Sequence, residues 1–269
     1  MEILPAGFRF SQGSLAASAL CHRRFYLRYL RHLSWPSAAD GPGLAKERGA
    51  ARGHLFHHLV HQHALGLAVE AQVAASDDPV LARWWTNYLQ HPPLGVPAGE
   101  IFSELELWVP LGTWWLTARF DRVIVGREGG LWVIDWKTGG GEPAAYLDTW
   151  QTLVYCFVLC EGGSLLTGGA EVAPEQISLC YWPAAFPEQV QWHQYDRSRH
   201  ELAREKLQAA FGFLAELASP EAFAKTPEKQ RCQNCEYQSY CARGPGVGAG
   251  WETDGDEEED WGLAPGLDW

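Results

Sequence analysis

The sequence predicts a mixed α/β fold, because helical and strand patterns occupy alternating blocks of one chain of 269 residues. Helical periodicity comes first, then a block of strands, and a helix, further strands and a last helix follow. The length suits one large domain with a sizeable core. Hydrophobic residues at 46% and charged residues at 20% are typical of a globular protein.

The N-terminal part has apolar residues at helical spacing, which predicts helices over residues 14–33, 44–75 and 81–90. Ser11 or Ser14 is a suitable N-cap for the first helix. The pattern then changes to alternating, β-branched and aromatic runs over residues 101–109, 114–125 and 131–136. Because Gly112 and Gly129-Gly130 separate these runs with turn signals, they predict an antiparallel meander.

After the predicted meander, the residue pattern predicts a helix at 144–161, strands at 176–182 and 190–195, and a helix at 197–218. Beyond it, residues 244–269 are rich in Gly, Pro and acids and lose all periodicity. We therefore expect two parts: a domain at 1–243 and a disordered tail at 244–269. The tail contains Trp251, Trp261 and Trp269. These fit either a solubilising tail or a segment that docks on a partner.

Taken alone, the formal charge of −12 argues against a nucleic-acid partner, since phosphate contacts need Lys and Arg. Eight of the 33 acids lie in the tail, which has no Lys or Arg, so 25 acids face 21 bases in the body. Residues 3–39 contain five arginines and no acid. DNA therefore remains a candidate partner. We expect Arg23, Arg24 and Arg28 to follow its backbone, and the tryptophans to stack on unpaired bases.

No apolar run reaches the roughly 20 residues of a membrane-spanning helix, and the N-terminal residues lack a secretion-signal pattern. We therefore expect a cytoplasmic protein without a membrane partner.

Three of the seven cysteines, Cys232, Cys235 and Cys241, form C-x2-C-x5-C in a polar segment. This spacing favours metal ligation, and Cys21 is the candidate fourth ligand. Four thiolates suit Zn²⁺ or an iron–sulfur cluster, and the spacing leaves both open.

Two aspartates and a lysine carry the clearest chemical signal. Asp121 and Asp135 fall on adjacent arms of the predicted meander, with Lys137 two residues after Asp135. Carboxylate oxygens favour Mg²⁺ or Mn²⁺, which binds a phosphate oxygen and acidifies a bound water. Lys137 would stabilise charge on the phosphate or orient the water. Ordinary surface ion pairs are the alternative interpretation.

The ordered set of motifs resembles the PD-(D/E)XK nuclease superfamily, in the Asp-x-Lys-Thr-Gly form of its RecB/Cas4-like branch. The matching segments, over roughly residues 11–243, are Ser14-Leu15, Cys21-His22-Arg23-Arg24-Phe25-Tyr26, Gly53-x-x-x-His57, Asp121, Asp135-Trp136-Lys137-Thr138-Gly139, Gln151-x-x-x-Tyr155 and the C-terminal cysteines. Two positions depart from the family pattern: His22 replaces a proline, and Ala118 replaces a glycine. Neither departure removes a charged or ligating group.

The resemblance implies a restriction-endonuclease-like core, in which a mixed sheet is flanked by helices. It implies that His57 and the carbonyl of Trp136 join the aspartates as metal ligands, and that a 4Fe-4S cluster joins Cys21 to the C-terminal cysteines. Glu104 is favoured over Glu106 as a further acid facing the metal. Gln151 and Tyr155, one helical turn apart, would face the site, although Tyr155 also suits helix–sheet packing.

The predicted helix at 44–75, which contains His57, carries other histidines, and only the Gly-x-x-x-His match selects His57 over His58 and His61.

The resemblance implies a Mg²⁺- or Mn²⁺-dependent deoxyribonuclease, with an exonuclease on single-stranded ends as the expected form. Its setting would be DNA repair, recombination, CRISPR adaptation or phage defence, with a helicase or a defence-complex protein as partner. A non-catalytic DNA-binding subunit is the alternative. No Gly-x-x-x-x-Gly-Lys-Ser/Thr loop for ATP is present.

Overall fold

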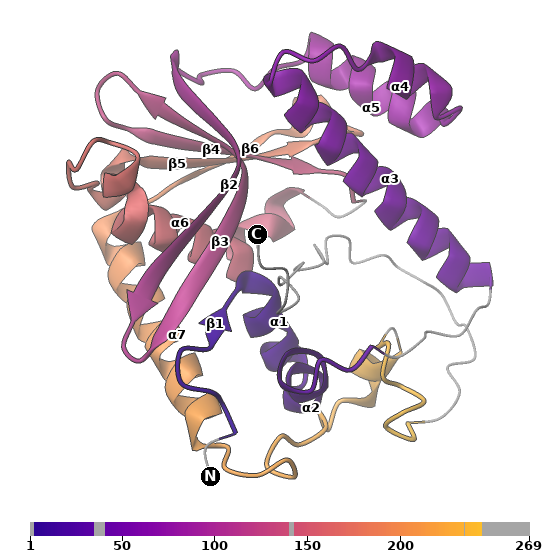
Figure 1. Ribbon diagram of the computed structural model, residues 1–269, viewed down its shortest axis with the longest axis vertical. Coiled ribbons are helices and arrows are strands. Elements are labelled where there is room, and N and C mark those ends of the chain that lie inside the picture. The colour runs from indigo at the N-terminus through magenta and orange to yellow at the C-terminus, as the bar shows by residue number, and fades with distance from the viewer. Residues whose placement is uncertain (1–2, 35–40, 140–142, 234, 244–269) are drawn as a thin grey trace, which may run out of the picture.

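The computed structural model describes residues 3–34, 41–139, 143–233 and 235–243. The tail at 244–269, for which disorder is predicted, lies outside these residues. Among the described helices, none has the length and apolar character needed to cross a membrane. The described chain contains a mixed six-stranded sheet with helices on both of its faces, in agreement with the predicted fold class (Figure 1).

The sheet has the strand order β1-β3-β4-β5-β6, and β2 pairs with β3. The strands are β1 (Arg9–Phe10), β2 (Gly99–Leu111), β3 (Trp114–Gly126), β4 (Leu131–Lys137), β5 (Ile177–Pro183) and β6 (Gln191–Gln194). The β1/β3 and β4/β5 pairs are parallel, and the other pairs are antiparallel. The predicted meander is therefore confirmed as β2–β3–β4, with Gly112 and Gly129 at positive φ in its turns.

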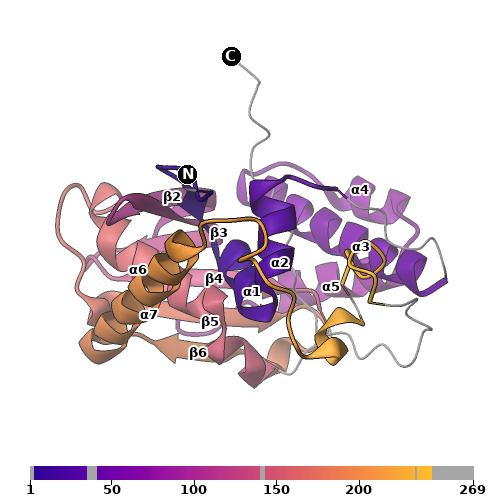
Figure 2. The same cartoon turned by 90° about the horizontal axis from the view of Figure 1, so that it is seen from below.

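The helices divide between the two faces of the sheet (Figure 2). One core cluster joins α1 (Gln12–Leu20), α6 (Trp150–Gly162) and α7 (Arg197–Glu216) to the sheet. A second cluster joins α3 (Gly41–Ala64), α4 (Glu70–Ala75) and α5 (Pro79–Gln90) to the opposite face. The α3–α5 group and the α6–α7 group therefore enclose the strands between them.

The helix predicted over 14–33 is interrupted in the structure. The α1 helix ends at Leu20, Cys21 is extended, and α2 (His22–Phe25) leads into a π-helical turn at Tyr26–Leu30. The C-terminal segment supplies the reason for the break. The Thr226 N–H contacts the Cys21 Sγ at 3.3 Å, and the Arg23 N–H donates to the Ala224 carbonyl at 3.1 Å. The Ala224 carbonyl thus takes the Arg23 N–H, which in a continuous helix would donate to the carbonyl four residues earlier, and the Thr226 contact holds the Cys21 side chain against the C-terminal segment.

Two further helical predictions need correction at their boundaries. The segment 44–75 forms α3 and α4 separately, because Gly66 adopts a positive φ of 78° between them. The segment 144–161 begins as a 3-10 turn at Pro143–Asp148, and α6 starts only after the N-cap Thr149. The α5 and α7 helices match their predictions to within two residues.

The sequence did not predict β1, because two residues are too short to show strand alternation. Its Phe10 is fully buried and stacks on Phe211 of α7, with ring centroids 3.9 Å apart. Phe10 also lies 6.4 Å from the ring of Phe25 in α2. This one side chain therefore joins the sheet, the last helix and the N-terminal helices.

Replacing Phe10 with Ala should lower the free energy of unfolding by about 3–5 kcal/mol, since a buried aromatic ring leaves a cavity. Chemical denaturation of the purified protein measures the change. Phe213→Ala, on the same helix as Phe211 but 46% exposed, is the matched control and should cost less than about 1 kcal/mol. Equal losses in the two variants would contradict the packing role of Phe10.

Candidate active site and cysteine pocket

Asp121 lies where β3 separates from β4. The backbone pairing between these strands ends at Arg122–Ile134, so the next pair would be Asp121 opposite Asp135. Instead, the Asp121 Oδ2 accepts a hydrogen bond from the Trp136 N–H at 2.8 Å. The side chain thus satisfies a backbone donor that the separating strands would leave without its ladder partner. This contact fixes one carboxylate oxygen at the end of the ladder.

The pairing of β3 with β2 is interrupted at the same place. Ser103–Arg122 and Leu105–Phe120 are paired, but Glu104, between them, has a φ of 54°. A non-glycine residue in this left-handed region costs about 1–3 kcal/mol and is typical of functional sites. The interruption lies opposite Asp121. It therefore places Glu104 beside that aspartate.

Three predicted metal ligands meet at this point. Ligand atoms of His57, Glu104 and Asp121 all lie within 4.8 Å of one another, and the His57 Nδ1 is 3.2 Å from the Asp121 Oδ1. Burial opposes ionisation of Asp121, but His57, the Trp136 N–H and Lys137 together hold its pKa below the usual value. Two carboxylates and an imidazole suit Mn²⁺, and with added waters Mg²⁺.

Asp135 and Lys137 form a separate, buried pair on β4. The two side chains are 0% and 1% exposed, and the Lys137 Nζ lies 3.0 Å from the Asp135 Oδ2. Gln151 of α6 bridges them, because its Oε1 accepts from Lys137 at 2.7 Å and its Nε2 donates to the Asp135 Oδ1 at 2.9 Å. The predicted residues Asp135, Lys137 and Gln151 are thus together. Asp135 is not in the group that His57, Glu104 and Asp121 form.

Aromatic residues surround this pair. Tyr155 contacts the Gln151 Nε2 through its hydroxyl at 3.2 Å and packs on Phe120 at 4.7 Å between ring centroids. It therefore takes part both in the network and in helix–sheet packing. The Lys137 Nζ also lies 5.1 Å and 5.2 Å from the rings of Tyr146 and Tyr181, which suits a cation kept from water.

Gly53 allows α3 to approach the end of β4. A Cβ atom at Gly53 would lie 2.7 Å from the Oγ1 of Thr138, closer than side chains pack. His57 stands one helical turn after Gly53, so the approach of the helix sets the distance from His57 to Asp121. This gives a physical reason for the glycine in the Gly-x-x-x-His motif.

The alternative candidates for metal ligands, two histidines and one glutamate, lie away from the ligand atoms around Asp121. His58 and His61 do not join the group of ligand atoms around Asp121. Glu106 instead accepts from the Trp108 Nε1 at 2.6 Å and the Thr117 Oγ1 at 3.1 Å.

Sequence reasoning missed Arg119, whose guanidinium lies 2.7 Å from the Glu104 Oε2. Its position two residues before Asp121, on the same side of a strand, is the signal that could have found it.

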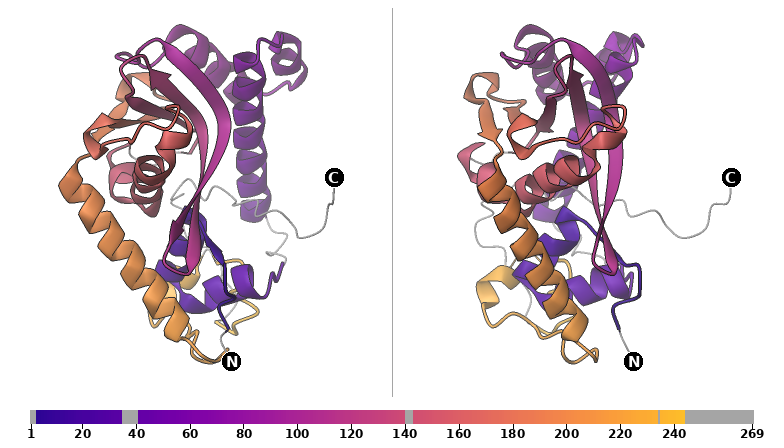
Figure 3. Two further views of the ribbon diagram at one scale, coloured as in Figure 1. Left: turned by 60° about the vertical axis from the view of Figure 1, so that its left-hand side comes forward. Right: turned by 90° about the vertical axis from the view of Figure 1, so that its left-hand side faces the viewer.

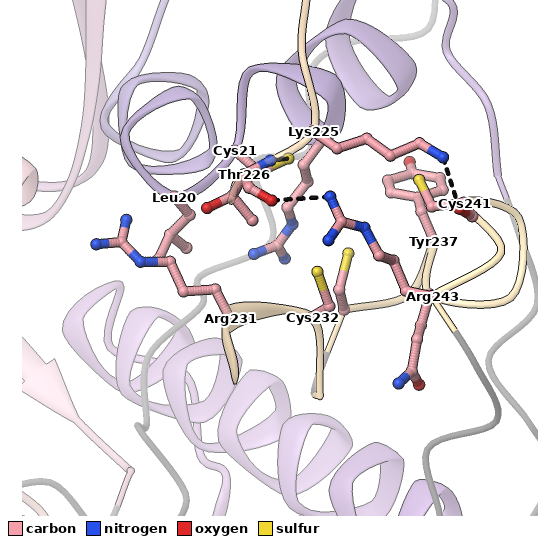
Figure 4. A pocket seen from close by; sticks show the side chains of 12 residues that line it. Leu20, Cys21, Lys225, Thr226, Arg231, Cys232, Tyr237, Cys241 and Arg243 are labelled. Carbon is pink, nitrogen blue, oxygen red and sulfur yellow. Dashed lines mark hydrogen bonds between the residues drawn. The ribbon is translucent and has the colours of Figure 1, made fainter. Parts of the chain in front are cut away.

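All four predicted cluster cysteines line one pocket (Figure 4). Cys21 comes from the break between α1 and α2, and the other three from the C-terminal segment: Cys232, Cys235 and Cys241. Burial raises the pKa of Cys235 to about 12 and also raises that of Cys241. Such thiols ionise when a metal binds them. Four sulfur donors in one pocket fit a metal or an iron–sulfur cluster.

Two of the arginines expected to contact DNA are engaged within the protein. Arg24 is 8% exposed and lies 3.2 Å from Glu236, and Arg28 lies 3.8 Å from the same carboxylate. A phosphate contact would have to break these ion pairs. Arg23 lies 5.6 Å from the ring of Tyr26. Arg24 and Arg28 therefore join the N-terminal helices to the cysteine segment, a role the sequence did not predict.

A family model described as the PD-(D/E)XK nuclease superfamily matches residues 9–242, nearly all of the described chain. The chain belongs to this superfamily. The comparison with curated proteins found no match to this chain. A solved structure described as "Crystal structure of SSO0001" is similar to it with a TM-score of 0.42 and 12% identity, covering 87% of this chain and 85% of that chain.

Membership of the superfamily indicates which reaction this group of side chains suits. PD-(D/E)XK proteins are metal-dependent nucleases, and DNA is the substrate that the family implies. The aspartates and the lysine of this chain stand in the order that the superfamily's name describes: Asp121, Asp135 and Lys137. The structure adds His57, Glu104 and Gln151 around them.

Replacing Gly53 with Ala should weaken Mn²⁺ binding about tenfold, because the added Cβ pushes α3 and His57 away from Asp121. Isothermal titration calorimetry of the metal-free protein measures the affinity. Thr138→Ala removes the clashing oxygen, so the double variant should recover most of the affinity. Gly49→Ala, on the same helix with open space around it, is the matched control. Equal metal affinity in Gly53→Ala and the wild type would contradict this account.

Proposed function

We propose that this protein is a Mg²⁺- or Mn²⁺-dependent deoxyribonuclease of the RecB/Cas4-like branch, acting as an exonuclease on single-stranded DNA ends. The observation that supports it is the meeting of His57, Glu104 and Asp121 beside the buried Asp135–Lys137 pair. A divalent ion bound there would acidify a water and neutralise charge on the scissile phosphate.

Each residue has a role that follows from its contacts. His57, Asp121 and Glu104 would hold the ion, and Asp121 is kept in place by the Trp136 N–H. Asp135 stands at the end of the same ladder and would join them when the strand ends adjust to the ion. Lys137 would meet the phosphate or the attacking water. Gln151 would hold the Lys137 ammonium in a fixed position at the end of β4, since its side chain hydrogen-bonds both Lys137 and Asp135.

We further propose that the cysteine pocket holds a 4Fe-4S cluster. Tetrahedral Zn²⁺ with bonds of about 2.3 Å would gather its four sulfurs tightly. Within the described residues, the groups of three or more ligand atoms that lie within 4.8 Å of one another do not include these cysteines. A cluster of several irons suits wider spacing. It would join Cys21 to a segment about two hundred residues later, and so close a long loop.

Removing the lysine should abolish cleavage. Lys137→Met alone leaves Asp135 buried and uncompensated, which costs about 3–5 kcal/mol and can unfold the protein. The Asp135→Asn/Lys137→Met double variant removes both charges and should stay folded while losing at least about a hundredfold in rate. Cleavage of end-labelled DNA with Mn²⁺, together with thermal unfolding, measures both effects.

Lys206→Met, an exposed lysine of α7, is the control and should cleave like the wild type. Undiminished cleavage by the folded double variant would reject the assignment. A wild-type protein that binds DNA tightly without cleaving it would favour the alternative, a non-catalytic DNA-binding subunit.

Covalently closed single-stranded circles test the exonuclease proposal, since they have no ends and should resist cleavage.

Anaerobically purified protein should be brown and contain iron and acid-labile sulfide. Cys235→Ser should lose both, whereas Cys160→Ser, which changes a cysteine outside the pocket, should keep them. Iron and sulfide analysis with visible absorption provides the measurement. A colourless protein containing one zinc ion per chain would reject the cluster and favour Zn²⁺.

The proposed substrate class suggests the pathways in which the protein would act. A single-strand exonuclease serves DNA repair and recombination, or CRISPR adaptation and phage defence. We propose a helicase or a defence-complex protein as partner, with the acidic segment 244–269 and its tryptophans as the docking element. Deleting that segment and measuring DNA affinity against salt distinguishes a partner contact from an effect on DNA itself.

A further inference from the structure

One face of the β2–β3 hairpin is open to solvent near its turn. In β2, Leu107 and Val109 point into the core cluster that α6 and α7 cover, so the alternate residue Trp108 points away from it. In β3, Leu116 is buried in the same way, and Trp115 points outward. Trp108 and Trp115 are 38% and 41% exposed. We name this exposed surface the tryptophan face.

The two tryptophans are neighbours on this face. Trp108 is paired across the strands with Thr117, and Pro110 with Trp115, so the two indoles stand on a diagonal. Diagonal neighbours in an antiparallel pair are about 7–8 Å apart. Large exposed aromatic side chains placed side by side are unusual on a surface without a partner.

Trp108 is held in a defined orientation. Its Nε1 donates to Glu106 at 2.6 Å, and that carboxylate also accepts from the Thr117 Oγ1. The guanidinium of Arg9, from β1, lies 3.8 Å from the centroid of the indole. Because the Arg9 guanidinium lies over one face of this indole, an unpaired base can stack on the part of the Trp108 ring that stays exposed, with the cation close enough to meet its phosphate.

The tryptophan face leads directly to the candidate active site. Along β3, outward-pointing positions continue from Trp115 through Thr117 and Arg119 to Asp121. Thr117 is the cross-strand partner of Trp108 and lies four residues before Asp121, about 13 Å at about 3.3 Å per residue. Arg119 lies between them, with its side chain 60% exposed and paired with Glu104. Figure 3 shows the two long strands β2 and β3 running together from their turn.

We propose that the tryptophan face binds the unpaired nucleotides of a single-stranded DNA whose scissile phosphate lies at Asp121. Trp108 and Trp115 stack on successive bases, and Arg9 meets a phosphate. Arg119 stays paired with Glu104 through its Nε and one terminal nitrogen, and its other N–H donors, on a side chain that is 60% exposed, meet the next phosphate. Stacking of this kind needs exposed base faces, which a duplex hides, so the face selects single strands without reading their sequence. This inference rests on the proposed function, since it extends from the same metal centre.

The test measures DNA binding separately from cleavage. With Ca²⁺ replacing Mn²⁺, fluorescence anisotropy reports the Kd for a labelled oligothymidylate of about 12 nucleotides. Trp108→Ala and Trp115→Ala should each weaken binding about tenfold, and Trp108→Phe should stay close to the wild type because it keeps an aromatic face. Affinity for blunt duplex of the same length should not change.

Phe213→Ala, an exposed aromatic residue on α7, is the matched control and should bind like the wild type. Hydrolysis of bis(p-nitrophenyl) phosphate with Mn²⁺ should be equal in all these variants, because this small phosphodiester cannot reach the tryptophan face. A Trp108→Ala/Trp115→Ala protein that binds oligothymidylate as tightly as the wild type overturns the inference. A wild type that hydrolyses no phosphodiester rejects the proposed function instead.

Discussion

The hydrogen bond from the Trp136 N–H to Asp121 is the contact on which the candidate site depends. It forms because β3 and β4 separate at this point, so that a backbone donor needs a new acceptor. The carboxylate that accepts it is thereby fixed at the end of the sheet. The neighbouring β2 is interrupted at the same position, with Glu104 in a left-handed conformation. Two breaks in the ladder thus create one site.

The buried pair of Asp135 and Lys137 has a cost that stability alone does not explain. Removing two charges from water is expensive, and well-packed apolar residues often stabilise a core better. Gln151 and the rings of Tyr146 and Tyr181 satisfy the pair in the absence of substrate. These contacts compensate a buried ion pair at the end of β4, next to the group of ligand atoms around Asp121.

The two ends of the described chain meet at the cysteine pocket. Glu236 pairs with Arg24 and Arg28, and the Thr226 N–H contacts the Cys21 Sγ, so side-chain and backbone contacts join the two segments. These arginines were predicted to bind DNA because the N-terminal segment contains no acid. Their partner lies more than two hundred residues away, and no local pattern could have shown it.

The sequence by itself determined the order of helices and strands and the meander, because these follow from local periodicity. Motifs of fixed spacing also selected the two aspartates and the lysine that lie together at the ends of β3 and β4. Strand parity does not separate Glu104, the acid favoured as a metal ligand, from Glu106, because both lie on the same side of the strand. The sequence also missed β1, Arg119 and the break at Cys21. Only the tertiary structure decided these points, because each depends on a strand interruption or on a partner distant in sequence, and neither leaves a periodic signal.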